Sequence, residues 1–502
     1  MQRRTFLQAG GALAALCAAP GFAQTPDPLL TPDAMRSDLA LLRRAFETLH
    51  PGLYRYNSPA QMAARFDALD QRFREPKTLA QAYLDLSALL ASIRCGHTYL
   101  NFYNQPATTK QALFAGRNIL PLRFAWIGGE MVVTDGLAHA ADIPRGSVIE
   151  SLNGQSASAL LAQLVPLVRV DGNNNVMQPG LLSADGADEI ETFDVFHGLL
   201  HPAQSVHRVL ARRPDGSRRT LELPAMDAAA RKTQHQNQRQ ADAARLKDAG
   251  TPVGWTFAIN AQGVGTLTMP GWAVYNTRWD WKAWLDGVFK QLASEKARGL
   301  IIDLRGNEGG LDCGDEILAR LIDAPIEVQS PRRLVRFREV PADLVPYMST
   351  WDRSFRTLGK DAEPEPPTGG REGFLHLKRE SDTSDRIEPK GPRFTGRTAV
   401  LVDAANHSAT FRFNGIVRRH RLATLIGEPT GGNQRGINGG AFFFMTLPAT
   451  QIEADIPLIG YFAPGNPPDA GYSPDVLAVR TARDLAAGTD RAMQAALRHV
   501  AA

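Results

Sequence analysis

The spacing of apolar residues divides the chain into regions of different character. In residues 31–100, leucine, alanine and phenylalanine recur at helical spacing, and Thr31 and Ser58 stand where helix N-caps are expected. Residues 118–225 instead contain short apolar runs separated by glycine turns, a pattern typical of strands, with one short helix predicted over 157–164. The pattern therefore predicts a helical region followed by a β-rich module.

The second half of the chain alternates predicted strands with predicted helices. Strands are expected at 263–269, 299–304, 398–402 and 423–426, and helices at 279–297 and 408–420. Such alternation favours a sheet covered by helices. The predicted fold class is multidomain α/β, with α+β parts, in which a helical bundle and a β module precede an α/β unit.

These patterns give the expected domain boundaries. We predict a helical domain over 28–115, a β-rich module over 116–225, a polar linker over 226–251 and a catalytic α/β domain over 252–502. Residues 354–396 are rich in proline, glycine and charge, which predicts an inserted loop within the last domain. The sequence leaves open whether this loop is a lid.

The first residues have the features of an export signal. Arg3 and Arg4 precede an apolar run at 10–19, which is too short to span a bilayer, and small residues precede a cleavage point after Ala23. The paired arginines resemble a twin-arginine signal. We expect residues 1–23 to be removed and the mature chain to be periplasmic or secreted, without a stable membrane span.

Composition narrows the classes of function. Lysine and arginine number 56 against 52 acidic residues, and there is no long basic run, so no nucleic-acid partner is expected. Three cysteines are too few for a disulfide scaffold or a four-cysteine zinc site. The histidines are scattered outside any metal-binding motif, so neither a metal nor another cofactor is expected. The oligomeric state is not predicted.

Three short segments carry candidate chemistry. A buried strand runs into the glycine loop at 306–310, whose N–H groups suit an anion, although a tight turn between strand and helix also explains the glycines. Ser408 stands where a strand ends and a helix begins, either as an N-cap or as a nucleophile on a sharp turn. His97, in Gly-His-Thr, ends the helical region, where a lone histidine is more often structural.

Together these segments resemble the tail-specific, or C-terminal-processing, serine peptidases, in the branch nearer to the tricorn core and the interphotoreceptor retinoid-binding repeats. Residues 300–310 resemble that family's Ile-Ile-Asp-Leu-Arg-x-Asn-x-Gly-Gly stretch, and residues 408–431 resemble its nucleophile helix and following strand. Residues 471–476 resemble its closing segment, and residues 144–154 resemble its degenerate PDZ-like module. The resemblance implies a PDZ-like β module and a catalytic domain of the ClpP/crotonase-like type.

The resemblance also assigns roles. It implies Ser408 as the nucleophile and the backbone N–H groups of Ala409 and of Gly309 or Gly310 as the oxyanion hole, which acts on charge that develops in the transition state. The expected protein is a secreted serine-type peptidase that cleaves peptides or unfolded protein ends through a Ser-His mechanism and an acyl-enzyme.

The catalytic base is where this chain departs from the family pattern. Many relatives use a lysine after the serine, but Asn433 occupies that place and no lysine follows Lys390. The tricorn-like branch uses a histidine, and the Gly-His-Thr setting points to His97; His407 ranks second, because neighbouring side chains at a strand end point apart. Asp469 lies near where the branch places the acid that orients the histidine.

Two other functions remain open. The missing lysine, and Cys95 where relatives often carry an acidic residue, are compatible with a ligand-binding protein that has lost catalysis on the same scaffold. The same serine and oxyanion hole also permit hydrolysis of non-peptide esters or amides. Cys95 and Cys313 flank two of the motifs, so we consider a disulfide between them, with two unpaired cysteines as the alternative.

Overall fold

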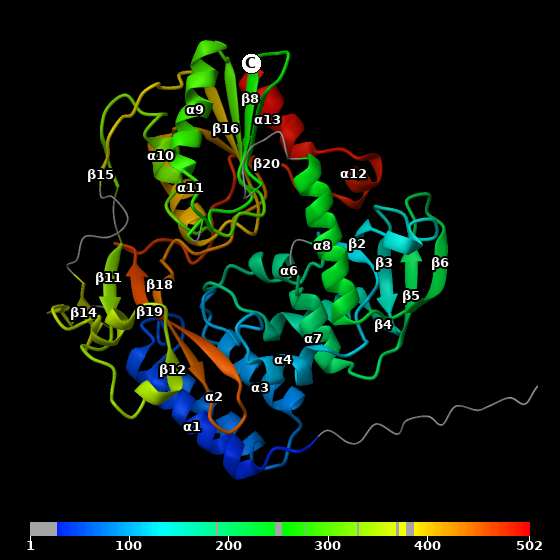
Figure 1. Cartoon of the computed structure of the whole chain (residues 1–502), viewed down its shortest axis with the longest axis vertical. Coiled ribbons are helices and arrows are strands. Elements are labelled where there is room, and N and C mark those ends of the chain that lie inside the picture. The colour runs from blue at the N-terminus through cyan, green and yellow to red at the C-terminus, as the bar shows by residue number, and fades with distance from the viewer. Residues whose placement is uncertain are drawn as a thin grey trace, which may run out of the picture.

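The computed structural model describes residues 28–186, 189–245, 254–275, 277–328, 331–367, 371–377 and 386–501. Helices and sheets are mixed along the chain, which confirms the predicted α/β fold class (Figure 1). The predicted export signal, residues 1–23, lies outside the described residues. Among the helices that the structure describes, none is long and apolar enough to cross a membrane.

The N-terminal region is a helical bundle whose first two helices begin at the predicted caps. Thr31 caps the first helix, and Ser58 and Thr78 form capping boxes with Gln61 and Gln81 at the next two. The bundle consists of α1 (Pro32–Leu49), α2 (Pro59–Arg72), α3 (Leu79–Ala91) and α4 (Ala107–Phe114).

A twisted sheet follows, with strand order β1-β2-β3-β5-β6 and β4 paired with β3. Its strands are β1 (Arg123–Ile127), β2 (Glu130–Asp135), β3 (Val148–Leu152), β4 (Gln155–Ser156), β5 (Val206–Arg212) and β6 (Arg218–Pro224), and its helices are α5 (Ala157–Leu164), α6 (Met177–Leu181) and α7 (Thr192–Leu200). Within the expected linker, Ala228–Arg245 form helix α8. A buried ion pair between Arg231 and Asp194, 2.8 Å long, fastens α8 to α7.

The C-terminal sheet has the order β20-β17-β16-β9-β8-β7 and is parallel except for β7. Alternate residues of β9 and β16 face two different cores, one under α9, α10 and α11 and the other under α13. The elements are β7 (Thr256–Ile259), β8 (Val264–Thr268), α9 (Trp281–Ser294), β9 (Gly299–Asp303), α10 (Gly314–Leu318), β16 (Arg397–Val402), α11 (Ser408–His420), β17 (Thr424–Gly427), β20 (Val476–Leu477), α12 (Ala482–Ala487) and α13 (Arg491–Ala501).

A further sheet, with order β12-β18-β19-β11-β14-β13, packs its long hairpin against the N-terminal bundle (Figure 1). Asp38 of α1 accepts hydrogen bonds from the N–H groups of Ala449 and Thr450 in the hairpin turn. The strands are β11 (Arg332–Val335), β12 (Met348–Ser349), β13 (Glu363–Pro364), β14 (Leu375–His376), β18 (Asn438–Thr446) and β19 (Glu453–Phe462), while β10 (Ile326–Glu327) and β15 (Arg386–Ile387) form a separate pair. Part of the predicted insertion, 354–396, thus supplies edge strands.

The two cysteines of the described chain are free and buried, so the disulfide that we considered is absent. The physical reason is that each thiol packs in a different core. Cys95 belongs to the core that the helical bundle shares with the β18–β19 hairpin, and Cys313 belongs to the core beneath α9 and α11.

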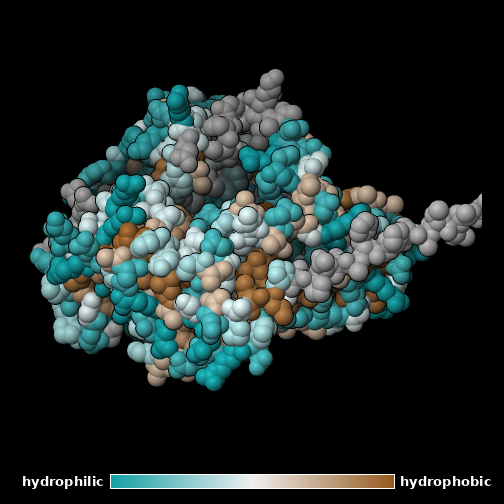
Figure 2. Space-filling model, turned by 60° about the horizontal axis from the view of Figure 1, so that its bottom comes forward, coloured by the Kyte–Doolittle hydropathy of each residue, from teal (hydrophilic) through white to brown (hydrophobic). Residues whose placement is uncertain are grey.

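The surface carries apolar residues in patches among polar ones, as the side brought forward in Figure 2 shows. Among the described residues, the large apolar side chains that are at least 60% exposed are Leu29, Tyr275, Trp351 and Leu477. Single exposed apolar side chains are common in folded proteins, but clusters of them need an explanation.

Candidate active site

The chain takes a strained conformation at Ser408. Strand β16 ends at Val402, and α11 begins at Ser408, whose φ is +53°. A non-glycine residue in the left-handed region costs on the order of 1 kcal/mol or more, and it persists only where the surrounding structure imposes it. Ser408 is therefore not the N-cap of α11, since His407 occupies the N-cap position.

The glycine loop after β9 lies directly against this turn. A Cβ atom on Gly309 would lie 2.9 Å from both the Ala409 nitrogen and the Ser408 Cβ, so only glycine fits there. The loop also pairs with the segment at Trp272. The Trp272 N–H donates to the Gly309 carbonyl, and the Leu311 N–H donates to the Trp272 carbonyl.

Two buried asparagines connect the glycine loop to the serine turn. Asn307 Nδ2 donates to the Met269 carbonyl, and Asn307 Oδ1 accepts from the Thr410 hydroxyl at 2.8 Å. Asn406 Nδ2 donates to the carbonyls of Leu304 and Asn307, at 2.6 and 3.2 Å. These bonds fix the two loops relative to each other, and sequence analysis did not single out either asparagine.

The hydrogen bonds of Asn307 also distinguish between the backbone N–H groups that the sequence predicts as oxyanion-hole donors. The Gly309 N–H donates to Asn307 Oδ1 at 2.9 Å, so it is already used. Within the described residues, no hydrogen-bond acceptor faces the N–H of Gly310 or of Ala409. Of the two glycines that the sequence left open, Gly309 already donates within its loop, whereas the Gly310 N–H takes part in no hydrogen bond among the described residues.

His97 lies in a turn held by residues from distant parts of the chain. His50 Nδ1 accepts from the Gly52 N–H, so His50 Nε2 carries the proton that bonds Thr98 Oγ1 at 2.7 Å. The buried Asp171 accepts from the Gly96 N–H at 2.7 Å. The buried His50 thus supports the turn of His97, while Asp171 was missed in the sequence because it is 75 residues from its partner.

The turn brings His97 close to the serine loop. The rings of His97 and His407 meet edge to face, with their centroids 5.7 Å apart. His407 Nε2 bonds Glu308 Oε2 at 3.2 Å, and Glu308 also lies 3.5 Å from Arg169. Among the described residues, neither histidine forms a hydrogen bond with the Ser408 hydroxyl.

The electrostatics of this cluster favour a neutral His97 and an ionised Glu308. Burial, together with the neighbouring His407 and Arg169, lowers the pKa of His97 to about 3, and Glu308 opposes this shift. Burial raises the pKa of Glu308, but the hydrogen bond from His407 and the charge of Arg169 outweigh this and hold it at about 2. A neutral imidazole has a lone pair that can accept a proton.

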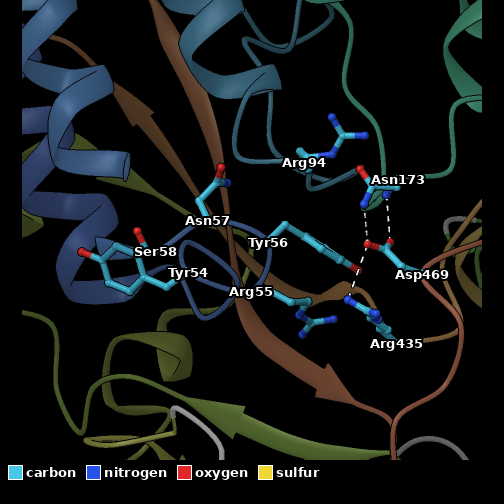
Figure 3. A pocket seen from close by; sticks show the side chains of 9 residues that line it. All are labelled: Tyr54, Arg55, Tyr56, Asn57, Ser58, Arg94, Asn173, Arg435 and Asp469. Atoms are coloured by element: carbon cyan, nitrogen blue, oxygen red, sulfur yellow. Dashed lines mark hydrogen bonds and ion pairs between the residues drawn. The ribbon is translucent and has the colours of Figure 1, made fainter. Parts of the chain in front are cut away.

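Asp469 lies in the wall of a surface cavity of about 430 Å³ (Figure 3). It accepts from the N–H and the side chain of Asn173 and from Asn433 Nδ2, and it pairs with Arg435. No contact joins Asp469 to His97 within the part of the chain that the structure describes. Asn433 also donates to the Asp171 carbonyl.

The described residues were also compared with the donor sets that bind metal ions. Among the described residues, histidine, cysteine and acidic side chains do not form a group of three or more that suits a metal ion.

Comparison with known proteins now defines the family. Residues 263–440, which include the glycine loop, Ser408 and Asn433, match the model of Peptidase family S41. The chain carries a domain of the S41 family of serine peptidases. No curated protein sequence matches the chain.

Solved structures match the S41 chain over most of its length. Mature CPAF in complex with lactacystin has a TM-score of 0.60 at 15% identity, and the match covers 93% of this chain and 97% of that one. Mature CPAF alone has a TM-score of 0.56 at 14% identity, covering 91% and 94%. At such low identity, these matches establish a shared fold, which extends beyond the S41 segment to the helical bundle and the β-rich module.

Proposed function

We propose that Ser408 is the nucleophile of this S41 peptidase, His97 its general base, and the N–H groups of Ala409 and Gly310 its oxyanion hole. The observation that carries the proposal is the left-handed conformation of Ser408, pressed against Gly309 at the start of α11. A strained turn of this kind holds a serine hydroxyl out from a helix, with the following N–H aimed at the same point.

The chemistry then follows the acyl-transfer route. Ser408 Oγ bonds the carbonyl carbon of the scissile peptide while its proton passes to His97, and the carbonyl oxygen, now negative, accepts from Ala409 and Gly310. The C–N bond breaks as His97 returns the proton to the leaving amine. Water then attacks the acyl-enzyme, His97 takes a proton from it, and Ser408 leaves with that proton as the acid product departs.

His97 is preferred to His407 because of their partners. Nδ1 is buried without a partner in both rings, but His407 Nε2 already bonds Glu308, whereas no hydrogen bond engages either ring nitrogen of His97 among the described residues. A histidine base has to move within hydrogen-bond reach of Ser408, and such bonds often tighten only when substrate binds.

For Asp469 we propose a positioning role. It holds Asn433, which donates to the Asp171 carbonyl, and Asp171 in turn accepts from Gly96 beside His97. Through this chain of contacts, Asp469 supports the histidine turn without touching the histidine.

The substrates that we propose are peptides or unfolded protein ends, met outside the cytoplasm after residues 1–23 have directed export. Hydrolysis of non-peptide esters or amides uses the same groups and remains an alternative. A catalytically retired binding protein is also an alternative, which the absence of a Ser408–histidine hydrogen bond among the described residues favours.

Substitution of the serine tests the proposal. Ser408→Ala should abolish peptide hydrolysis and labelling by a fluorophosphonate probe, with the thermal unfolding midpoint unchanged. His97→Ala should lower the labelling rate by about a hundredfold or more, since general-base catalysis commonly contributes that much. A wild-type chain that no fluorophosphonate labels, or a Ser408→Ala variant with full activity, would falsify the proposal.

A further inference from the structure

Three aromatic side chains form a partly exposed cluster beside the candidate site, and we call Trp351, Phe442 and Phe444 the aromatic platform. Trp351 is 62% exposed, and its ring centroid lies 5.8 Å from that of Phe442 and 5.7 Å from that of Phe444. Phe355 supports Trp351 from another side, with its ring edge to face at 5.4 Å. The platform therefore presents a large apolar surface to solvent.

The platform forms because successive side chains of strand β18 point to opposite faces of the sheet. Phe442 and Phe444 are two residues apart, so they share one face of the strand and are only half-buried, whereas Phe443 and Met445 point into the core and are fully buried. Trp351 follows the short edge strand β12, whose Ser349 pairs with Phe444. This pairing brings the tryptophan over the exposed face of β18.

The platform is continuous with the proposed catalytic groups. The Phe442 ring lies 6.0 Å from the His97 ring, centroid to centroid, and His97 lies 5.7 Å from His407, which directly precedes Ser408. The His97 ring therefore contacts both the platform, through Phe442, and the residue that precedes Ser408.

We propose that the aromatic platform is a substrate subsite that binds a large apolar side chain of the peptide, close to the scissile bond. This inference rests on the proposed function of Ser408. The occupant follows from chemistry: exposed aromatic faces gain about 25 cal/mol for each Å² of apolar area covered, and aromatic side chains stack on one another. Continuity with His97 favours a substrate side chain over a separate partner.

Binding to the Ser408→Ala variant tests the subsite without turnover. The probes are end-blocked peptides of glycine and serine that contain one phenylalanine, placed at each position in turn, and the same peptides with alanine instead. We expect phenylalanine at one position to tighten binding about tenfold over alanine, an effect the size of one well-buried aromatic contact. In the Ser408→Ala background, Trp351→Ala should remove this preference and Trp351→Phe should keep most of it.

Leu477→Ala is the matched control, because Leu477 is 65% exposed on β20 and takes no part in the platform. The inference fails if Trp351→Ala and Leu477→Ala give the same ratio of phenylalanine to alanine affinities. It also fails if Trp351→Ala instead converts a dimer to a monomer in sedimentation, which would make the platform an interface between copies. Fluorophosphonate labelling of the chain with Ser408 intact reports separately on the proposed function.

Discussion

The serine turn and the histidine turn supply the two halves of one proposed mechanism, but they are built in opposite ways. Ser408 lies where β16 leads into α11, and one loop, residues 306–310, packs against it and is bonded to it through Asn307 and Asn406. His97 is held by contacts from three separate segments, through His50, Asp171 and Asn438. The nucleophile thus depends on two adjacent loops of one sheet, while the base depends on how several parts of the chain pack.

The largest effect should come from filling the space beside the serine turn. In Gly309→Ala, the new Cβ would meet the Ala409 nitrogen and the Ser408 Cβ at 2.9 Å, which forces the nucleophile and an oxyanion donor apart. We expect kcat/KM for peptides to fall by about a hundredfold to a thousandfold, the range seen when one oxyanion donor is lost.

Gly306→Ala is the control for this substitution. Gly306 has a φ of +76° in the same loop, but a Cβ there would meet nothing within 4 Å. It should cost about 1 kcal/mol of stability from the unfavourable φ and leave kcat/KM within a few-fold. Equal losses of activity in both variants would show that general strain in the loop, and not the contact with Ser408, controls the site.

Removal of a buried hydrogen bond should weaken the turn that holds His97. Asp171→Ala leaves the buried Gly96 N–H without its acceptor, so we expect a loss of about 1–3 kcal/mol in the free energy of unfolding. Because the turn then no longer fixes His97, kcat/KM should fall about tenfold or more. Urea unfolding and peptide hydrolysis measure the two effects.

Asp171→Asn and Asp67→Ala sharpen this test. The asparagine keeps an oxygen that can accept from Gly96, so it should recover most of the activity. Asp67 makes only a surface ion pair with Arg43, so its loss should cost less than about 1 kcal/mol and no activity. If Asp171→Ala behaves like Asp67→Ala, the His97 turn does not depend on long-range packing.

The same contrast explains what the sequence could predict. Helix α11 and strand β9 were predicted almost to the residue, because a buried strand, a turn and an amphipathic helix are local patterns. The β18–β19 hairpin was not predicted, since its place is set by the N-terminal bundle, where Asp38 caps its turn. Two-residue edge strands such as β13 are too short to show a period in the sequence.

The residues of the candidate site also divide into those that the sequence could predict and those that it could not. Ser408 and the glycine loop were recognisable from their motifs, and the hydrogen bond from the Gly309 N–H to Asn307 is the reason why we propose Gly310 as the oxyanion donor. Glu308 and Asp171 were missed, because each acts on a residue 75 or more positions away. Of the two alternatives left open for Cys95 and Cys313, the structure shows the unpaired one, because nearness to two motifs says nothing about which core each thiol enters.

The smallest effect that we predict concerns the pH dependence of the labelling rate, which reports on the protonation of His97. Burial lowers the pKa of His97 to about 3, with His407 and Arg169 adding to the shift, so this ring is neutral from neutral pH down to about pH 4. A histidine with the ordinary value near 6.5 would instead be about nine-tenths protonated at pH 5.5. Because the native state holds His97 neutral, its contribution to stability is full above about pH 6.5 and is lost as the pH falls from there toward 3. The rate of fluorophosphonate labelling should therefore stay nearly constant from pH 8 to about pH 5. A labelling rate that halves near pH 6.5, in a chain still folded by circular dichroism, would mean that the base is an exposed histidine and not His97 in its packed turn.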